Sequence, residues 1–231
     1  MSLATRAPRP ISAAPPADAS APISFVDRAS RSSDSVPKRA VDLAGSAFGL
    51  LLLLLPMLVV AAVIRLTSRG PAIYRQERIG LDGRPFEILK FRTMYADADR
   101  RLDELKKRTT IEGPLFKMID DPRITPVGRV LRRFSIDELP QLVNVLLGDM
   151  SLVGPRPALS CEVDEYCARA VRRLEAVPGM TGAWQVGGRS TLSWEAGLDL
   201  DIHYVDNWNL RYDVVILART VRAVVLPVGA Y

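Results

Sequence analysis

The pattern of hydrophobic and polar positions divides the chain into three parts. Residues 1–36 are rich in Pro, Ala and Ser and nearly free of aromatic side chains. Such a segment buries too little apolar surface to offset the entropy of ordering, so we predict a disordered tail. Residues 37–66 contain one long apolar run, and residues 67–231 are expected to form a folded domain.

The apolar run, LAGSAFGLLLLLLPMLVVAAVI, extends from Leu43 to Ile64 without a charged residue. Its length is sufficient to cross a bilayer core, which takes about 20 helical residues. Pro56 lies inside the run, removes a backbone hydrogen bond and is expected to bend the helix. A buried helix of a soluble protein is disfavoured, because Leu50 to Leu55 leaves no polar face.

Basic residues flank the apolar run on both sides. Lys38 and Arg39 precede it, and Arg65 and Arg69 follow it. Positive charges normally mark only the cytoplasmic side of a membrane helix. A re-entrant helix, which enters the membrane, bends near Pro56 and returns to the same face, explains both flanks. A single-pass helix with a tolerated proline is the alternative.

The remaining pattern predicts a mixed α/β fold that is mainly helical. Strands are expected over AIYRQERIG and PFEILKF, joined by a hairpin turn at Asp82-Gly83. A glycine-rich loop is expected over 178–190, and helices over 95–108, 127–133, 159–175, 194–207 and 213–226. The last helix contains Arg219 and Arg222 in an apolar segment. It fits either a helix in the lipid headgroup region, with its arginines snorkelling, or an ordinary core helix.

Composition narrows the class of protein. A chain of 231 residues has room for one domain with an appendage, and its net charge of +5 suits an anionic membrane, a phosphate-rich substrate or nucleic acid. We recognise no nucleic-acid-binding module, so nucleic acid is disfavoured as a partner. His203 is the only histidine, which gives little support to Ser-His catalysis or a multi-histidine metal site. Cys161 and Cys167 fit no common zinc motif and are expected to be free thiols.

The segment SIDELP, residues 135–140, holds the most informative carboxylates. A structural interpretation exists, because Ser135 and Glu138 match a capping box and Asp137 could itself cap a helix. Three arginines lie just upstream, within residues 129–133. Carboxylates at a helix N-terminus near arginines are expected to stay ionised, as attack on phosphorus requires. One carboxylate could attack while the other holds Mg²⁺, which binds through one or two carboxylates plus substrate oxygens.

Several basic and polar side chains are candidates for binding phosphate or substrate. Arg156 lies between two prolines, which fix the backbone and limit the entropy lost on presenting a guanidinium. The glycine-rich loop offers a backbone that a ligand can approach closely, although it contains no nucleotide-binding fingerprint. An ordinary surface charge is the alternative for any single arginine, above all for Arg75 and Arg78. The candidates are Lys90, Arg92, Arg132, Arg156, Gln185 and Arg189.

Taken together and in order, these segments closely resemble the bacterial sugar transferase family, the monotopic phosphoglycosyl transferases. The resemblance runs from about Pro37 to the C-terminus and is carried by the proline-interrupted apolar run, AIYRQERIG, FEILKFRTM, ITPVGRVLRRFSIDELPQLVNVLLGDMSLVGPRP and PGMTGAWQVGGRS. It implies a re-entrant helix in one leaflet and amphipathic helices at the interface. It also implies a location on the cytoplasmic face of the bacterial inner membrane, at the start of exopolysaccharide, capsule or glycan synthesis.

The same resemblance implies a mechanism. Asp137 would attack the β-phosphorus of a UDP-sugar and release UMP, leaving a covalent phosphosugar intermediate that undecaprenyl phosphate then attacks. Glu138 would bind Mg²⁺, while Arg132 and Arg156 would bind phosphate groups. The implied kinetics are ping-pong, as is usual for covalent intermediates. The implied partners are a UDP-sugar, undecaprenyl phosphate and membrane lipids, with a homodimer as a candidate assembly.

The chain departs from the family pattern in two respects. Some relatives have Ser-Pro at the bend, whereas Leu55-Pro56 provides no hydroxyl for the freed backbone group. Larger members carry additional transmembrane helices and a soluble domain, so this chain is expected to be a minimal or shortened form. Two other functions fit the same motifs: a phosphohydrolase that passes the intermediate to water, and a non-catalytic membrane scaffold for polysaccharide assembly. No residue decides which sugar is transferred.

Overall fold

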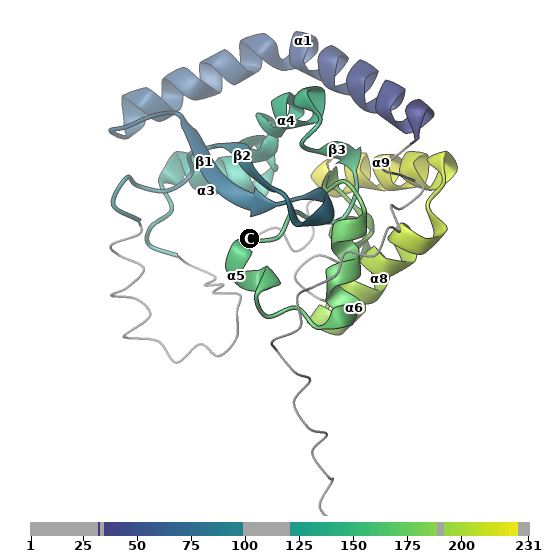
Figure 1. Cartoon of the computed structure of the whole chain (residues 1–231). Coiled ribbons are helices and arrows are strands. Elements are labelled where there is room, and N and C mark those ends of the chain that lie inside the picture. The colour runs from purple at the N-terminus through teal and green to yellow at the C-terminus, as the bar shows by residue number, and fades with distance from the viewer. Residues whose placement is uncertain (1–31, 33–34, 99–120, 189–191, 226–231) are drawn as a thin grey trace, which may run out of the picture.

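The computed structural model describes residue 32 and residues 35–98, 121–188 and 192–225 (Figure 1). Most of the predicted disordered tail, most of the predicted helix over 95–108 and Arg189 lie outside the described residues. Within them the fold is mixed α/β and mainly helical, with two small two-stranded sheets. The predicted fold class is confirmed at this level.

Helices and strands follow one another along the chain, and η marks a 3-10 helix. In chain order they are α1 (Val36–Thr67), β1 (Ile73–Ile79), η1 (Leu81–Gly83), β2 (Pro85–Phe91), α3 (Pro126–Arg133), η2 (Ile136–Glu138), α4 (Gln141–Leu147), β3 (Ser151–Val153), α5 (Ser160–Val163), α6 (Ala168–Val171), η3 (Arg172–Glu175), β4 (Gly179–Thr181), α7 (Ala183–Gly187), α8 (Trp194–Asn207) and α9 (Leu210–Val225).

Most predicted elements are present. Strands β1 and β2 form the expected antiparallel hairpin, turning at Asp82 and Gly83, and both of these residues have positive φ. Helices α3 and α8 agree with their predicted ranges, and α9 begins three residues before its predicted start. Cys161 and Cys167 are free and exposed, as expected.

Two of the predicted elements differ in the structure. The single helix expected over 159–175 is divided into α5, α6 and η3. Cys167 adopts an extended conformation between α5 and α6, and the backbone tightens to a 3-10 helix directly after α6. The loop expected over 178–190 contains strand β4, which pairs in parallel with β3, and helix α7. Pairing with a strand from another part of the chain is not visible in local sequence.

Helix α1 arches along one side of the domain, over the hairpin, α4, β3 and α9 (Figure 1). Its 32 residues form one continuous helix that includes Pro56, so the proline bend does not divide it into two helices. Ser35 begins it as an N-cap that accepts a hydrogen bond from the Lys38 amide.

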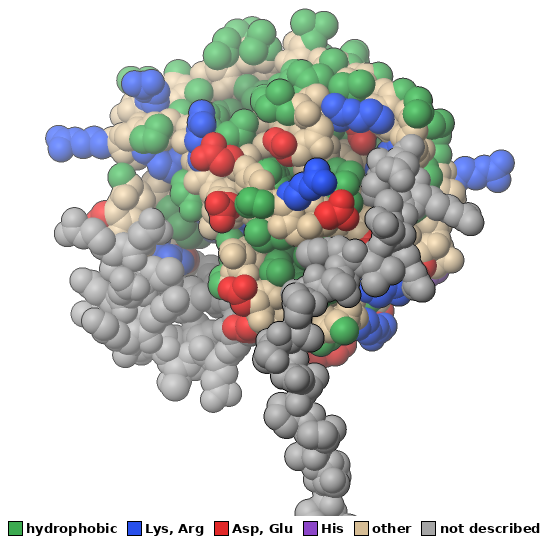
Figure 2. Space-filling view, viewed as in Figure 1, with side chains coloured by type: hydrophobic (Ala, Val, Ile, Leu, Met, Phe, Trp, Pro, Cys, Tyr) green, Lys and Arg blue, Asp and Glu red, His purple; other side chains and the backbone are tan. Residues whose placement is uncertain are grey.

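The outer surface of α1 is hydrophobic. Among the described residues, α1 is the one helix that is long and apolar enough to cross a membrane, and only 6% of its most apolar 18-residue window is buried. Leu51, Leu55 and Leu66 are between 71% and 86% exposed. Figure 2 shows hydrophobic side chains gathered along this side of the molecule. The exposure distinguishes α1 from a core helix and is consistent with membrane association.

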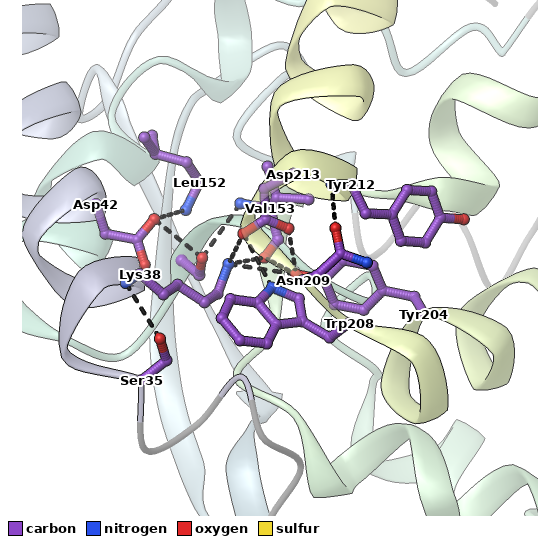
Figure 3. A network of polar contacts seen from close by, with 11 residues as sticks. Ser35, Lys38, Asp42, Leu152, Val153, Tyr204, Trp208, Asn209, Tyr212 and Asp213 are labelled. Atoms are coloured by element: carbon purple, nitrogen blue, oxygen red, sulfur yellow. Dashed lines mark hydrogen bonds and ion pairs between the residues drawn. The ribbon is translucent and has the colours of Figure 1, made fainter.

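A buried polar network holds the N-terminal end of α1 (Figure 3). Lys38 Nζ donates to Asp213 Oδ2 at 2.8 Å, to Val153 O at 2.9 Å and to Tyr204 Oη at 3.2 Å. Trp208 Nε1 also donates to Asp213 Oδ2, at 3.0 Å. The Lys38 and Asp213 side chains are only 4% and 5% exposed. If α1 moved away, Lys38 and Asp213 would each lose the partner that compensates its buried charge, which is strongly unfavourable. The network therefore fixes α1 to β3 and α9.

Arg39 and Asp42, at the same end of α1, add further contacts. Arg39 donates to Val145 O at 2.7 Å and to Leu146 O at 2.9 Å, which satisfies carbonyl groups at the end of α4. Asp42 Oδ1 accepts a hydrogen bond from the Leu152 amide at 2.9 Å. The two basic residues before the apolar run therefore make tertiary contacts, a role that the charge pattern did not indicate.

The C-terminal half of α1 packs on the opposite part of the same domain. Its residues after Pro56 join one hydrophobic cluster with β2, α3 and η2. Arg92 Nη2 donates to Ser68 O at 2.9 Å and to Ser68 Oγ at 2.8 Å, directly after the helix. Both ends of α1 thus contact one domain. The cluster contains Met57, Val60, Ala61, Ile64, Phe91, Val127, Leu131, Ile136 and Leu139.

Asn144 of α4 forms hydrogen bonds with the edge of β2 that faces away from β1. Its side chain is almost fully buried, donates to Glu87 O at 2.7 Å and accepts from the Leu89 amide at 3.0 Å. These bonds satisfy main-chain groups that β1, on the other side of β2, does not reach. The hairpin is therefore fixed to the segment that follows the acidic pair Asp137-Glu138.

Candidate active site

Asp137 and Glu138 lie on η2, a three-residue turn between α3 and α4. The residue before it, Ser135, has φ 55° and ψ 23° and makes no side-chain cap. The predicted capping box is therefore wrong, because a capping residue needs an extended backbone. The alternative of Asp137 as N-cap also fails, since Asp137 lies inside η2. A left-handed conformation costs a non-glycine residue about 1–2 kcal/mol, and such strain is found preferentially at functional sites.

The acidic pair lies next to the apolar helix. Ile136 and Leu139, which flank Asp137 and Glu138, pack in the cluster that contains the C-terminal half of α1. Over these four residues, one apolar anchor therefore lies on each side of the pair of carboxylates. The result places both carboxylates close to the side of the domain that α1 covers.

Two cations face the acidic pair. Lys90 Nζ of β2 forms an ion pair with Glu138 Oε1 at 2.9 Å, and the two side chains are 25% and 38% exposed. Arg132, in the last turn of α3, lies close enough to Asp137 for the aspartate's charge to raise the arginine pKa, although burial has the larger, lowering effect. Arg132 Nε donates to Thr93 Oγ1 at 2.9 Å. Lys90, Arg132 and the acidic pair therefore form one cluster.

The pKa of Asp137 departs from the expectation. Burial, and then the negative charge of Glu138, raise it from 3.8 to about 6, and the lowering effects of Lys90 and Arg132 are smaller. The nearby cations therefore do not lower this pKa, although the expectation of an ionised carboxylate still holds at neutral pH. One pKa unit is a factor of ten, so at pH 7 the ionised form still predominates by about tenfold. Such shifts are typical of functional sites.

Arg156 lies in the loop between β3 and α5 and is linked to this cluster through Arg78. Its side chain is 42% exposed and its Nη1 atom lies 3.4 Å from Oε1 of the buried Glu162. Arg78 of β1 is adjacent: burial, and then the charge of Arg156, lower the pKa of Arg78 to about 10, while Glu162 and Glu138 raise it. Arg78 is only 7% exposed, so the alternative of a surface charge is wrong for this residue. It holds for Arg75, which is 66% exposed.

The other predicted binding residues are more widely distributed. Arg92 is buried against the end of α1, apart from Lys90 although only one residue separates them. Gln185 lies in α7, with its Oε1 atom beside Gly182. Arg189 lies outside the described residues. The structure therefore brings together Lys90, Arg132, Asp137 and Glu138, with Arg156 adjacent.

Sequence reasoning missed Arg78 and the two partners Thr93 and Glu162. For Arg78 a signal exists, because alternate residues of a strand share one face. Tyr74 lies opposite Lys90 in the hairpin, so Arg78 lies on the same face as Lys90. Thr93 and Glu162 make contacts over 39 and 6 residues that no local pattern indicates.

Asp137 and Glu138 could supply only part of the ligand set of a magnesium ion. The described part of the chain contains no group of three or more His, Cys, Asp or Glu residues that could hold a metal ion. Asp137 and Glu138 provide one or two carboxylates, which is what Mg²⁺ uses when water and substrate phosphates supply its other ligands. The donor set therefore fits Mg²⁺ that binds together with a phosphate substrate, and not a closed protein cage.

Comparison with known proteins agrees with this arrangement. The sequence profile described as bacterial sugar transferase matches residues 33–227. The exopolysaccharide production protein ExoY of Sinorhizobium fredii is 41% identical over 85% of this chain and 88% of its own length. The UDP-glucose:undecaprenyl-phosphate glucose-1-phosphate transferase of Caulobacter vibrioides is 43% identical over 84% of this chain and 72% of its own length.

Other relatives are longer. The UDP-galactose-lipid carrier transferase of Erwinia amylovora is 43% identical over 84% of this chain, but the chain spans only 41% of that protein's length. The galactosyl transferase CpsE of Streptococcus agalactiae is similar in this respect, with 43% of its length covered. The shared part includes both the apolar helix and the carboxylate cluster. The chain belongs to the bacterial sugar transferase family.

Proposed function

We propose that this chain transfers a sugar 1-phosphate from a UDP-sugar to undecaprenyl phosphate, as the first membrane step of exopolysaccharide, capsule or glycan synthesis. One observation carries the proposal: Asp137, a half-buried carboxylate, lies among Lys90, Arg132 and Glu138 beside an apolar helix. The family and the names of the Caulobacter and Erwinia relatives support it. Those two names specify different sugars, so they do not identify the donor sugar of this chain.

The proposed reaction has two halves. In the first, a carboxylate oxygen of Asp137 attacks the β-phosphorus of the UDP-sugar. The bond from that phosphorus to the bridging oxygen breaks, UMP leaves, and the sugar phosphate remains on Asp137. In the second half, a phosphate oxygen of undecaprenyl phosphate attacks the same phosphorus. The Asp137–phosphorus bond breaks, which regenerates the carboxylate and yields undecaprenyl-diphosphate-sugar.

The neighbouring side chains have separate roles in this proposal. Arg132 and Arg156 bind phosphate oxygens, for which the planar guanidinium fork is well suited. Lys90 holds the Glu138 carboxylate in position through their ion pair. Glu138 would hold Mg²⁺, which when bound offsets the negative charge of the diphosphate. The raised pKa of Asp137 makes the carboxylate a stronger base, which favours attack on phosphorus.

A monotopic arrangement at the cytoplasmic face of the inner membrane is part of the proposal. Lys38 at one end of α1 contacts Asp213, and Ser68 just after the other end contacts Arg92. A helix that crossed the bilayer would place these ends on opposite sides, yet both contact one domain. We therefore infer that α1 enters and leaves the same leaflet. The lipid substrate would then reach Asp137 from the side that α1 covers.

The test is a UMP-release assay. Purified protein in lipid nanodiscs is incubated with Mg²⁺, undecaprenyl phosphate and each of a panel of UDP-sugars. We expect UMP from a particular donor, multiple turnovers only when the lipid is present, and no UMP from Asp137→Asn. The matched control is Asp164→Asn, which removes an exposed carboxylate and should leave turnover unchanged.

The same assay separates the alternatives. Free sugar phosphate in place of the lipid-linked product would identify a phosphohydrolase. Absence of UMP with every donor, from protein shown to be folded and membrane-bound, would contradict the transferase and support the scaffold. Equal activity of wild type and Asp137→Asn would contradict the role of the aspartate.

A further inference from the structure

The loop that carries Arg156 is held at four consecutive carbonyl groups. Each of the four accepts a hydrogen bond from a residue outside the loop. The bonds are Gly179 N to Pro155 O (2.8 Å), Arg173 Nη2 to Arg156 O (3.4 Å), Arg78 Nη1 to Pro157 O (3.2 Å) and Ile79 N to Ala158 O (2.9 Å). The donors come from β1, η3 and β4, so the loop cannot shift without breaking contacts to three elements.

The composition of the loop suits this arrangement. Pro155 and Pro157 have no backbone N–H and a fixed φ, so the carbonyls are the groups by which they can be held. Arg156 between them presents its side chain from a backbone with little remaining freedom. A guanidinium held in this way loses less entropy when it binds a phosphate.

Glycines allow the β3–β4 backbone to approach the loop closely. A Cβ atom on Gly179 would lie 2.0 Å from Gly154 N, and one on Gly182 would lie 2.2 Å from Gly154 O. No side chain fits at these distances. Gly182 belongs to the glycine-rich loop that was expected to admit a ligand, but its close neighbour is the backbone directly before Pro155.

Arg78 acts on the loop from the hairpin. Its Nη2 atom donates to Gln76 Oε1 at 2.7 Å while Nη1 donates to Pro157 O. The side chain is only 7% exposed, which leaves little surface for a substrate to contact. Arg78 also lies beside Arg156, so two positive charges are close together. This arrangement is unfavourable until Glu162 or a bound anion offsets the charges.

Arg173 acts on the loop from the opposite side. Its Nε atom donates to Asp201 Oδ2 at 2.9 Å, and its side chain is 3% exposed. Three aromatic rings surround the guanidinium, and cation–π contacts of this kind are strongest where water is excluded. The ring centroids of Tyr166, Trp184 and Trp194 lie 5.8, 5.4 and 5.5 Å from its central carbon. Arg173 is thus fixed where its Nη2 reaches Arg156 O.

We propose that Arg78 and Arg173 are positioning residues, which hold the backbone of residues 155–158 so that the Arg156 guanidinium meets a phosphate of the substrate beside Glu138. The inference rests on the proposed sugar-phosphate transfer. Neither residue touches the substrate. Both act through Arg156, because misplacing a binding group by a small distance weakens its contact in the transition state.

A double-mutant cycle tests this dependence. Arg78→Lys keeps the positive charge but replaces the fork with one ammonium, which cannot hold Pro157 O and Gln76 Oε1 in the same geometry. We expect kcat/KM for the UDP-sugar to fall about 10-fold, as for loss of a hydrogen bond to a charged group. In an Arg156→Ala background the same change should cost less than about 2-fold, because residues that act through one another are not additive.

The matched control is Arg75→Lys, on the opposite face of β1, where the side chain is 66% exposed. It should leave kcat/KM unchanged in both backgrounds. An equal loss from Arg78→Lys with and without Arg156 would overturn the proposal, as would wild-type kcat/KM in Arg78→Lys. A purely structural role would lower the thermal midpoint and the activity in both backgrounds alike.

A second variant keeps the test decisive if Arg78→Lys does not fold. Gln76→Ala leaves Arg78 in place but removes the acceptor of its Nη2 atom. We expect about a 3-fold loss of kcat/KM, the cost of one hydrogen bond, and only when Arg156 is present. The same loss in the Arg156→Ala background would again overturn the proposal. Wild-type protein that releases no UMP would instead refute the proposed function.

Discussion

The ionisation state of Asp137 is subject to two opposing effects. In the proposed reaction Asp137 must be ionised to attack phosphorus, yet burial and Glu138 favour its protonated form and raise its pKa to about 6. A carboxyl that binds its proton more tightly in the folded state destabilises the fold when it ionises. This cost is absent below about pH 4 and complete above about pH 6, given pKa values of 3.8 unfolded and about 6 folded.

Asp137→Asn should therefore stabilise the metal-free protein while it abolishes transfer. We expect a gain of about 1–2 kcal/mol at pH 7.5, allowing for solvent screening of a partly exposed group. The gain should shrink as the pH falls from 6 to 4. Thermal unfolding in EDTA across this range measures it, with Asp164→Asn as the control. A gain that does not depend on pH would contradict the assigned pKa shift.

Thr93 should affect activity through Arg132. Thr93→Val keeps the size of the side chain but removes the oxygen that accepts from Arg132 Nε. We expect kcat/KM to fall about 10-fold, as for one hydrogen bond to a charged group, and Thr93→Ser to restore most of it. Thr67→Val removes an exposed hydroxyl at the end of α1 and serves as the control. No change in Thr93→Val would exclude a positioning role.

At the scale of elements, local sequence determined the hairpin and the amphipathic helices, and long-range contacts determined the rest. The hairpin and α8 have local signals, namely the Asp82-Gly83 turn and the Ser193 cap. The division of 159–175 and the strand β4 depend on partners elsewhere in the chain, so no periodicity predicts them. The motif likewise identified the acidic pair but not Thr93, whose role depends on its contact with Arg132.

Asn144 provides a test of how α4 supports the hairpin. Asn144→Leu would leave the Glu87 carbonyl and the Leu89 amide without their partner. We expect the free energy of unfolding to fall by about 2–4 kcal/mol, since each unsatisfied buried group costs about 1–3 kcal/mol. Urea unfolding in detergent measures the change, and Asn207→Leu on the exposed side of α8 is the control. Equal stability of the two variants would show that the edge contacts are unimportant.

At the scale of the whole molecule, α1 joins the exposed apolar surface to the candidate active site. One end is held by the network around Lys38 and Asp213, and the other lies beside the turn that carries Asp137. The sequence indicated the apolar run, and its prediction of a re-entrant course rested on flanking charges. The structure provides a different argument, the contacts of both helix ends with one domain.

Thiol accessibility tests the re-entrant course. In a Cys161→Ser, Cys167→Ser background, Val36→Cys and Arg69→Cys place single thiols at the two ends of α1, where both native side chains are exposed. A membrane-impermeant maleimide should label neither in intact spheroplasts and both after lysis. The single variant Cys167→Ser, which keeps Cys161 in the domain, is the reference. Labelling of Val36→Cys before lysis would show that α1 crosses the membrane.

The covalent role of Asp137 is the central claim, and the intact mass of the protein tests it most directly. The protein is incubated with its UDP-sugar and Mg²⁺ but without undecaprenyl phosphate. We predict that wild type gains the mass of one sugar phosphate with release of one equivalent of UMP, that adding the lipid restores the original mass, and that Asp137→Asn gains nothing. Release of UMP only when both substrates are present, with the protein mass unchanged throughout, would contradict the account.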